Sequence, residues 1–125
     1  MKNLKKLPDA EFEVMKVVWA NPSPITTPEI MKQLGNERNW KIQSLVSFMV
    51  RLVEKGFLRS EKHGKERTYY PLISMAEYRK FETETVVRQF HNSSFLGLVT
   101  TLYEDEALTD EDIDGLLKWA KKRRG

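Results

Sequence analysis

Near the start of the chain, apolar residues recur every three or four positions, which is the spacing of one helix face. Phe12, Met15 and Trp19 carry this pattern, so we expect an amphipathic helix over residues 9–20. The two prolines of the segment 21–24 end this helix because proline interrupts helical hydrogen bonding.

A second, shorter helix is expected over residues 28–34. Thr27 is its candidate N-cap, Pro28 stands at the first helical position, and Gly35 occupies the place of a C-terminal cap. This helix is predicted to bury Ile30 on its apolar side.

A third helix is predicted over residues 41–55, ending at Gly56. At 3.6 residues per turn its apolar side chains share one face, which comprises Leu45, Phe48, Met49 and Leu52. The opposite face comprises Gln43, Ser47, Val50 and Glu54, with Val46, Ser44 and Arg51 flanking it. The outward face is therefore short, neutral and partly apolar.

Two alternating segments follow, at 57–63 and 66–72, and Gly64 marks the turn between them. They predict a β-hairpin with His63, Lys65 and Arg67 at its tip. Three helices and a hairpin in this order are typical of a winged helix-turn-helix, in which the third helix enters the major groove of DNA and the hairpin is the wing.

The rest of the chain returns to helical spacing in three pieces. The expected fold is mostly α with a small β-hairpin wing: a winged helix-turn-helix DNA-binding domain over residues 1–73 and a helical dimerisation domain over residues 74–125. Three short amphipathic helices expose more apolar surface than they can bury among themselves, so a symmetric homodimer is expected. The predicted dimerisation residues are Tyr78, Phe81, Phe90, Phe95, Leu98, Val99, Leu102, Ile113, Leu116 and Leu117.

Charge supports two separate roles along the chain. Residues 1–72 hold 13 Lys and Arg against 8 Asp and Glu, a net +5, whereas residues 73–125 hold 8 against 10, a net −2, which together give the +3 of the whole chain. The basic first part is suited to contact with a polyanion.

Composition excludes several other classes. Cysteine is absent, which removes disulfides, thiolate metal sites and a cysteine nucleophile. The two histidines, His63 and His91, lie in different predicted elements, so neither a metal site, a cofactor nor an enzyme activity is expected. No apolar run is long enough for membrane insertion, and a cytoplasmic location is expected.

Several local strings, in this order, resemble the penicillinase and methicillin-resistance repressor (BlaI/MecI) family of winged-helix regulators. The matching residues are 10–15, Trp19, 51–57, Tyr69 with Tyr70, 95–106, and Leu108 with Thr109. The resemblance spans nearly the whole chain. It implies a homodimeric repressor that binds a dyad-symmetric double-stranded DNA operator and is linked to β-lactam resistance genes.

The resemblance also implies a partner, a membrane sensor peptidase system that responds to β-lactams. In the family, cleavage occurs at an Asn-Phe bond in the second tail helix. The aligned pair in this chain is Thr101 and Leu102, so cleavage at that bond is in doubt here.

A second departure lies in the third helix, where family members often carry Lys-Thr followed by Arg. Gln43, Ser44 and Val46 occupy those positions, and with Ser47 they are the predicted base-reading residues. Gln pairs bidentately with adenine and Val packs on a thymine methyl. The alternative is that Gln43 and Ser44 are only the polar first turn of a surface helix.

The remaining cations and one helix start are predicted phosphate contacts that fix register without reading sequence. These residues are Thr27, Arg38, Lys41, Arg51, Lys65 and Arg67. For the hairpin cations the alternative is a solvated charged loop. For the whole protein the alternative function is a winged-helix protein-interaction module without sequence-specific DNA binding.

Overall fold

The computed structural model describes residues 4–35 and 37–124 of this chain. The chain divides into two compact units, Met1–Phe81 and Glu82–Gly125. Within the described residues, all helices are too short or too polar to cross a membrane.

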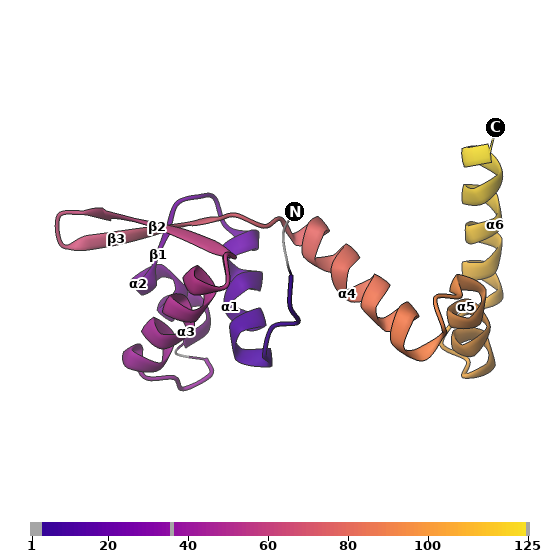
Figure 1. Cartoon of the computed structure of the whole chain (residues 1–125), viewed down its shortest axis with the longest axis horizontal. Helices are drawn as coiled ribbons and strands as arrows, with labels where there is room; N and C mark the ends of the chain where they lie inside the picture. Colours follow the sequence, from indigo (N-terminus) through magenta and orange to yellow (C-terminus); the bar gives the residue numbers. More distant parts are fainter. Residues whose placement is uncertain (1–3, 36, 125) are drawn as a thin grey trace. The chain divides into compact units, whose positions relative to one another are not determined.

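The first unit contains a three-helix cluster beside a small antiparallel sheet (Figure 1). Its elements in chain order are α1 (Asp9–Ala20), β1 (Ile25–Thr26), α2 (Thr27–Ile30), the π-helical turn η1 (Met31–Gly35), α3 (Ile42–Glu54), β2 (Leu58–His63) and β3 (Glu66–Pro71). The predicted order of helices and hairpin is therefore confirmed.

The second helix starts one residue earlier than the sequence predicts. Thr26, not Thr27, is the N-cap: its hydroxyl accepts a hydrogen bond from the backbone N–H of Glu29, and the Glu29 carboxylate accepts one from the backbone N–H of Thr26. This reciprocal pairing is a capping box. The helix then widens into η1, so Gly35 lies inside a helical turn and does not cap it.

The sheet has the strand order β1-β3-β2. Strand β1 pairs Ile25 with Tyr69. Because β1 has only two residues, no alternation of apolar and polar residues could predict it from the sequence. Strands β2 and β3 pair from Leu58 to His63, and the turn between them uses Gly64 at φ 66°. Glycine accepts this left-handed conformation without steric cost, which is why the hairpin turns here.

A single apolar core fills the first unit and reaches beyond the hairpin into α4 (Met75–Phe90). Tyr78 is only 2% exposed, and its hydroxyl accepts a 2.8 Å hydrogen bond from the backbone N–H of Leu7. Its ring lies 5.5 Å from that of Phe57 and 6.0 Å from that of Phe81. Tyr78 therefore packs in this core instead of presenting a dimerisation surface.

The compact first unit accordingly ends at Phe81, whereas the sequence suggested a boundary after residue 73. Trp19 contributes to this extension because its indole N–H donates a 2.9 Å hydrogen bond to the carbonyl of Ile73. The start of α4 is thus part of the head unit, since its first apolar residues face the core.

The second unit contains the rest of α4 together with α5 (Phe95–Glu104) and α6 (Asp110–Arg124). Ser94 caps α5 by accepting a hydrogen bond from the Gly97 N–H. Thr109 and Asp112 cap α6 reciprocally, with backbone-to-side-chain distances of 2.9 Å from the Thr109 N–H and 3.1 Å from the Asp112 N–H.

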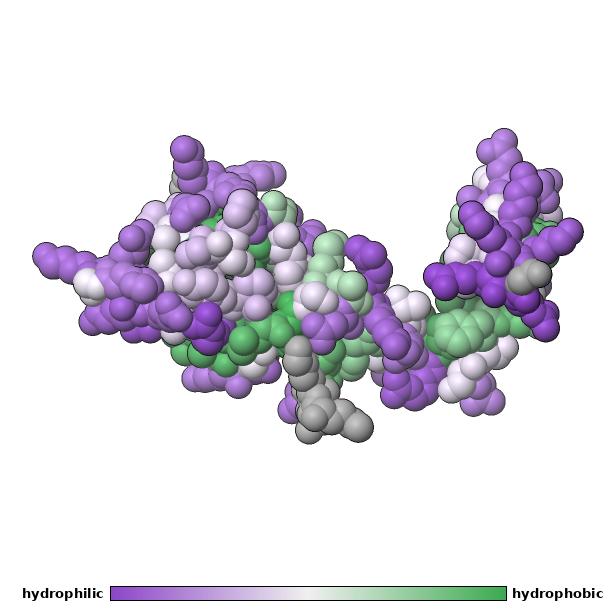
Figure 2. Space-filling model, turned by 90° about the horizontal axis from the view of Figure 1, so that it is seen from above, coloured by the Kyte–Doolittle hydropathy of each residue, from purple (hydrophilic) through white to green (hydrophobic). Residues whose placement is uncertain are grey.

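Apolar side chains of the second unit remain at its surface (Figure 2). Within the described residues, α5 and α6 bury no residue completely. The large exposed apolar residues are Val86, Phe90, Phe95, Leu96, Leu102, Tyr103, Leu116, Leu117 and Trp119. Monomeric surfaces rarely carry so many neighbouring apolar side chains, so this unit has the surface of a subunit interface.

Candidate DNA-binding surface

The exposed face of α3 is held outward by the packing of its opposite face. Leu45, Met49 and Leu52 are fully buried in the head core. The side chains that face solvent on the other side are Gln43, Val46, Ser47 and Val50, while Ser44 is half-buried at the flank. The structure therefore leaves most of the predicted base-reading residues available to a ligand.

Two contacts fix the position of α3 in the head. At its end, Lys55 forms an ion pair with the Glu11 carboxylate of α1, which is buried. In the middle of the helix, the Phe48 ring meets the ring of Trp40 edge to face with centroids 5.0 Å apart, and both side chains pack against the core. A helix held in this way presents its outer face in a defined orientation, which base recognition requires.

Arg51 and Lys41, two predicted phosphate contacts, flank this face. The Arg51 guanidinium lies 6.0 Å from the centroid of the Phe48 ring, a cation–π arrangement that holds it beside α3. Lys41 is exposed and is the N-cap residue of α3 without a side-chain capping bond. Both cations are thus placed at the edges of the outward face.

Arg38 and Thr27 are more engaged than the sequence suggests. Arg38 forms a 3.1 Å ion pair with Glu13 of α1, and Lys16 forms another at 2.8 Å. The hydrogen bond from Lys16 lowers the pKa of Glu13, and the charge of Arg38 adds to this shift. At the start of α2, the Glu29 N–H is already bonded to Thr26, so the amide site predicted near Thr27 is partly occupied.

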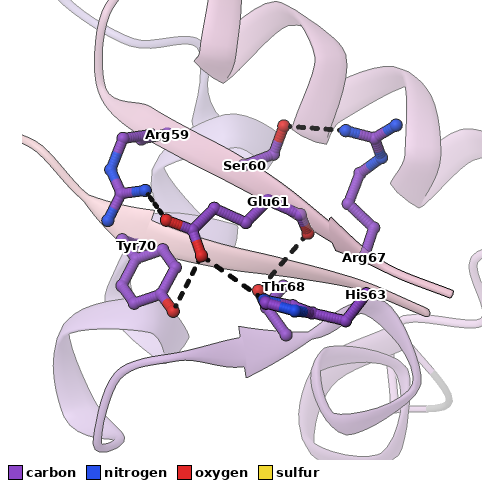
Figure 3. A network of polar contacts seen from close by, with 7 residues as sticks. All are labelled: Arg59, Ser60, Glu61, His63, Arg67, Thr68 and Tyr70. Atoms are coloured by element: carbon purple, nitrogen blue, oxygen red, sulfur yellow. Dashed lines mark hydrogen bonds and ion pairs between the residues drawn. The ribbon is translucent and has the colours of Figure 1, made fainter.

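The hairpin has two chemically different faces. On one face, Glu61 gathers the polar groups: Arg59 forms an ion pair with it, the His63 Nε2 lies 3.3 Å from its Oε2, and the Tyr70 hydroxyl donates to the same oxygen at 3.5 Å (Figure 3). The hydrogen bond from Arg59 lowers the pKa of the Glu61 carboxyl. This face is therefore internally neutralised.

The other face of the hairpin is cationic. Lys62 and Arg67 are direct cross-strand partners, and Lys65 lies in the turn beside them. Arg67 donates a 3.0 Å hydrogen bond to the Ser60 hydroxyl, which orients its guanidinium along this face (Figure 3). Like charges placed directly opposite each other destabilise a strand pair, so this arrangement favours a bound polyanion.

Lys62 and the Glu61 cluster are absent from the sequence-based site. The alternation of side chains along a strand could have indicated both, because residues 59, 61 and 63 point to one side of the hairpin and residues 60 and 62 to the other. What the sequence lacked was the register, which pairs Lys62 with Arg67 and Arg59 with Tyr70.

The second unit carries a hollow between α5 and α6 with a volume of about 430 Å³. Val99, Tyr103 and Ile113 line it with apolar surface, and its carboxylates include Asp110 and Asp114. The Tyr103 hydroxyl donates a 2.9 Å hydrogen bond to Asp110, which raises the pKa of Tyr103. Leu98, Val99 and Ile113 are half-buried around this region.

Thr101 and Leu102, at the family cleavage position, lie within α5, and both are exposed. The Thr101 carbonyl accepts a hydrogen bond from the Asp105 N–H at 3.1 Å. A peptidase would therefore need to unwind this turn to reach the bond. Within the described part of the chain, no group of three His, Cys, Asp or Glu side chains is placed to hold a metal ion.

Comparison with known proteins agrees with this architecture. The family model described as Penicillinase repressor matches residues 7–122 of the chain. The Penicillinase repressor of Bacillus licheniformis is 32% identical over 116 residues, which cover 93% of this chain and 90% of that protein. The methicillin resistance regulatory protein MecI of Staphylococcus aureus (strain N315) is 23% identical over 118 residues, covering 94% and 95%.

Solved structures extend the likeness to the head unit. The solution structure of the DNA-binding domain of the repressor BlaI matches with 37% identity and a TM-score of 0.55, covering 62% of this chain and 94% of that one. Monomeric B. licheniformis BlaI in complex with the blaP half-operator matches with 37% identity and a TM-score of 0.52 over the same shares. The winged-helix fold is thereby confirmed, and the chain belongs to the penicillinase repressor family.

Proposed function

We propose that this chain is a sequence-specific DNA-binding transcriptional repressor that acts as a homodimer on a dyad-symmetric operator. The observation that carries the proposal is the pairing, in one unit, of an exposed α3 face with a wing whose cations oppose each other across the strands. Its similarity to BlaI, which has been solved with a half-operator, gives further support.

Within this surface the two parts have different roles. The wing cations Lys62, Lys65 and Arg67 bind phosphates, which supplies affinity and salt dependence but no sequence information. The α3 face, with Gln43 at its polar side, contacts base edges in the major groove. Arg38 also stays a proposed phosphate contact; in the free protein its half-exposed guanidinium is paired with Glu13.

The homodimer is supported by the second unit. Phe90 is 74% exposed and Trp119 is 58% exposed, an unfavourable arrangement for a monomer in water. A two-fold interface would bury these faces in both subunits at once and would set two head units on two half-sites. The exposed part of the predicted dimerisation set is Phe90, Phe95, Leu102, Leu116 and Leu117.

The names of the relatives support β-lactam resistance genes as targets. A membrane sensor peptidase as partner rests on the family resemblance alone. Release by that partner, however, requires a route other than the family bond, because Thr101 and Leu102 replace the usual pair.

A binding titration with purified full-length protein tests the function. The duplex is the DNA upstream of the protein's own gene, and the control is the same base composition in shuffled order. Binding should be at least about a thousandfold tighter to the first duplex at physiological salt. Gln43→Ala should reduce this ratio, whereas Lys65→Ala should weaken both duplexes together. Equal affinity for the two duplexes would favour the protein-interaction alternative.

A further inference from the structure

Four β-branched side chains lie exposed along α3. Ile42 is 44% exposed, Val46 43%, Val50 49% and Val53 36%. Because residues in an α-helix are about 100° apart, these four positions fall within about 80° of the helix circumference. They form one continuous apolar stripe, which we name the valine stripe after its majority.

The polar residues of α3 lie beside this stripe and not among it. Gln43, Glu54 and Ser47 occupy the next sector of about 60°, and Arg51 follows at the far flank. The outer face of α3 is therefore divided lengthwise into an apolar half and a polar half. Exposed valines are unfavourable on a helix surface unless a ligand covers them.

The surroundings identify what covers the stripe. Lys41 at the start of α3 and Arg51 at its flank are exposed cations on the same helix, and the wing of the same unit adds a cationic face, which together match the phosphates of a duplex. Within the major groove, the apolar group that a duplex offers is the C5-methyl of thymine. An apolar protein partner would not need this surrounding charge.

We propose that the valine stripe reads thymine methyl groups, so that the operator half-site carries thymines which Val46 and Val50 contact directly. The two side chains are one turn apart, about 6 Å along the helix axis, which is close to two base-pair steps. Gln43, at the boundary with the polar half, lies where it can bind an adenine next to those thymines. This inference deepens the proposed DNA-binding function and rests on it.

Deoxyuridine supplies an atom-level test, because it differs from thymine only by the missing methyl. A duplex is first selected from a randomised pool with the full-length protein. Each thymine of one half-site is then replaced in turn by deoxyuridine, and the dissociation constant is measured. At two or more positions the affinity should fall about fourfold, the value expected for exposing one methyl group.

Protein variants locate the effect on the stripe. Val46→Thr and Val50→Thr keep the side-chain shape but replace a methyl by a hydroxyl, and both positions are exposed, so folding should be unaffected. Each variant should bind the thymine duplex more weakly and respond less to deoxyuridine at the position it contacts. Thr83→Val, which makes the reverse exchange at an exposed position of α4 outside the valine stripe and the apolar surface of the second unit, is the matched control and should behave as the wild type.

The outcomes separate this inference from the function on which it rests. If selection enriches no sequence, both fail. If a sequence is enriched but deoxyuridine changes affinity less than twofold at every thymine, the repressor function stands and the methyl-reading inference is overturned. Methyl reading is also overturned if the two valine variants retain full affinity, which would indicate that the stripe contacts another protein.

Discussion

Lys62→Gln should make the protein more stable and its DNA binding weaker. Lys62 faces Arg67 across the hairpin, and direct cross-strand neighbours have Cβ atoms about 5 Å apart. The two charges sit at the ends of long side chains and not at the Cβ atoms, so the roughly 0.8 kcal/mol of two unit charges at about 5 Å in water is an upper limit to their repulsion. Removing Lys62 should therefore raise the free energy of unfolding by about 0.5 kcal/mol, since solvent screening at this exposed site reduces the full repulsion.

The same change removes one phosphate contact. The slope of log affinity against log salt should become shallower by about 0.9, on duplexes of any sequence. Lys62 is the preferred position because its removal leaves the hydrogen bond from Arg67 to Ser60 in place. Lys80→Gln, at an exposed position of α4, removes the same charge away from the wing and is the matched control.

Urea unfolding and fluorescence anisotropy at four salt concentrations measure the two effects. A Lys62→Gln protein that is less stable than the wild type would refute the repulsion argument. An unchanged salt slope, or an equal change in the Lys80→Gln control, would refute the phosphate contact.

Four further predictions concern the core, the ion pairs and the second unit. Tyr78→Phe leaves a buried backbone N–H without its acceptor, so urea unfolding should show a loss of about 1–3 kcal/mol, with dimerisation unchanged in sedimentation. Glu13 has a lowered pKa, so its stabilisation is present above its usual value of 4.5 and is lost as pH falls through its folded pKa; Glu13→Gln should flatten acid unfolding curves in that range. Leu116 is 43% exposed in one subunit, so Leu116→Ala should weaken the dimer by about 1 kcal/mol in sedimentation equilibrium, and no shift would remove it from the interface. Intact-mass analysis after β-lactam exposure should find no fragment ending at Thr101, whereas Thr101→Asn with Leu102→Phe should permit cutting, because a subsite that hydrogen-bonds Asn rejects a residue lacking its amide.

The fold could be predicted from the sequence where periodicity is strong. The first helix is bounded as predicted, at Asp9–Ala20, because apolar spacing and the following prolines agree. Strand β1 could not be predicted, since two residues carry no period, and the N-cap of α2 could not be assigned between adjacent threonines, Thr26 and Thr27. Tertiary packing decides both the position of β1 and the N-cap of α2, because Thr26 pairs with β3 as a residue of β1.

The helix and the hairpin that carry the candidate site could be predicted from the sequence. The contacts that individual side chains make could be predicted less well. Exposure of Gln43 and Val46 follows from the helix period alone. The pairing of Arg38 with Glu13 joins residues 25 positions apart, which no local pattern contains. The amphipathic pattern of the tail is compatible with Tyr78 either in the core of the head unit or at a dimer interface. Only the structure shows that its ring faces Phe57.

The central claim is that this head unit reads DNA sequence, and a competition titration tests it most directly. The full-length protein is bound to a labelled duplex selected from a randomised pool, and unlabelled selected or shuffled duplex is then added at physiological salt. We expect the shuffled duplex to compete at least about a thousandfold less well. Competition by both duplexes at the same concentration would contradict it.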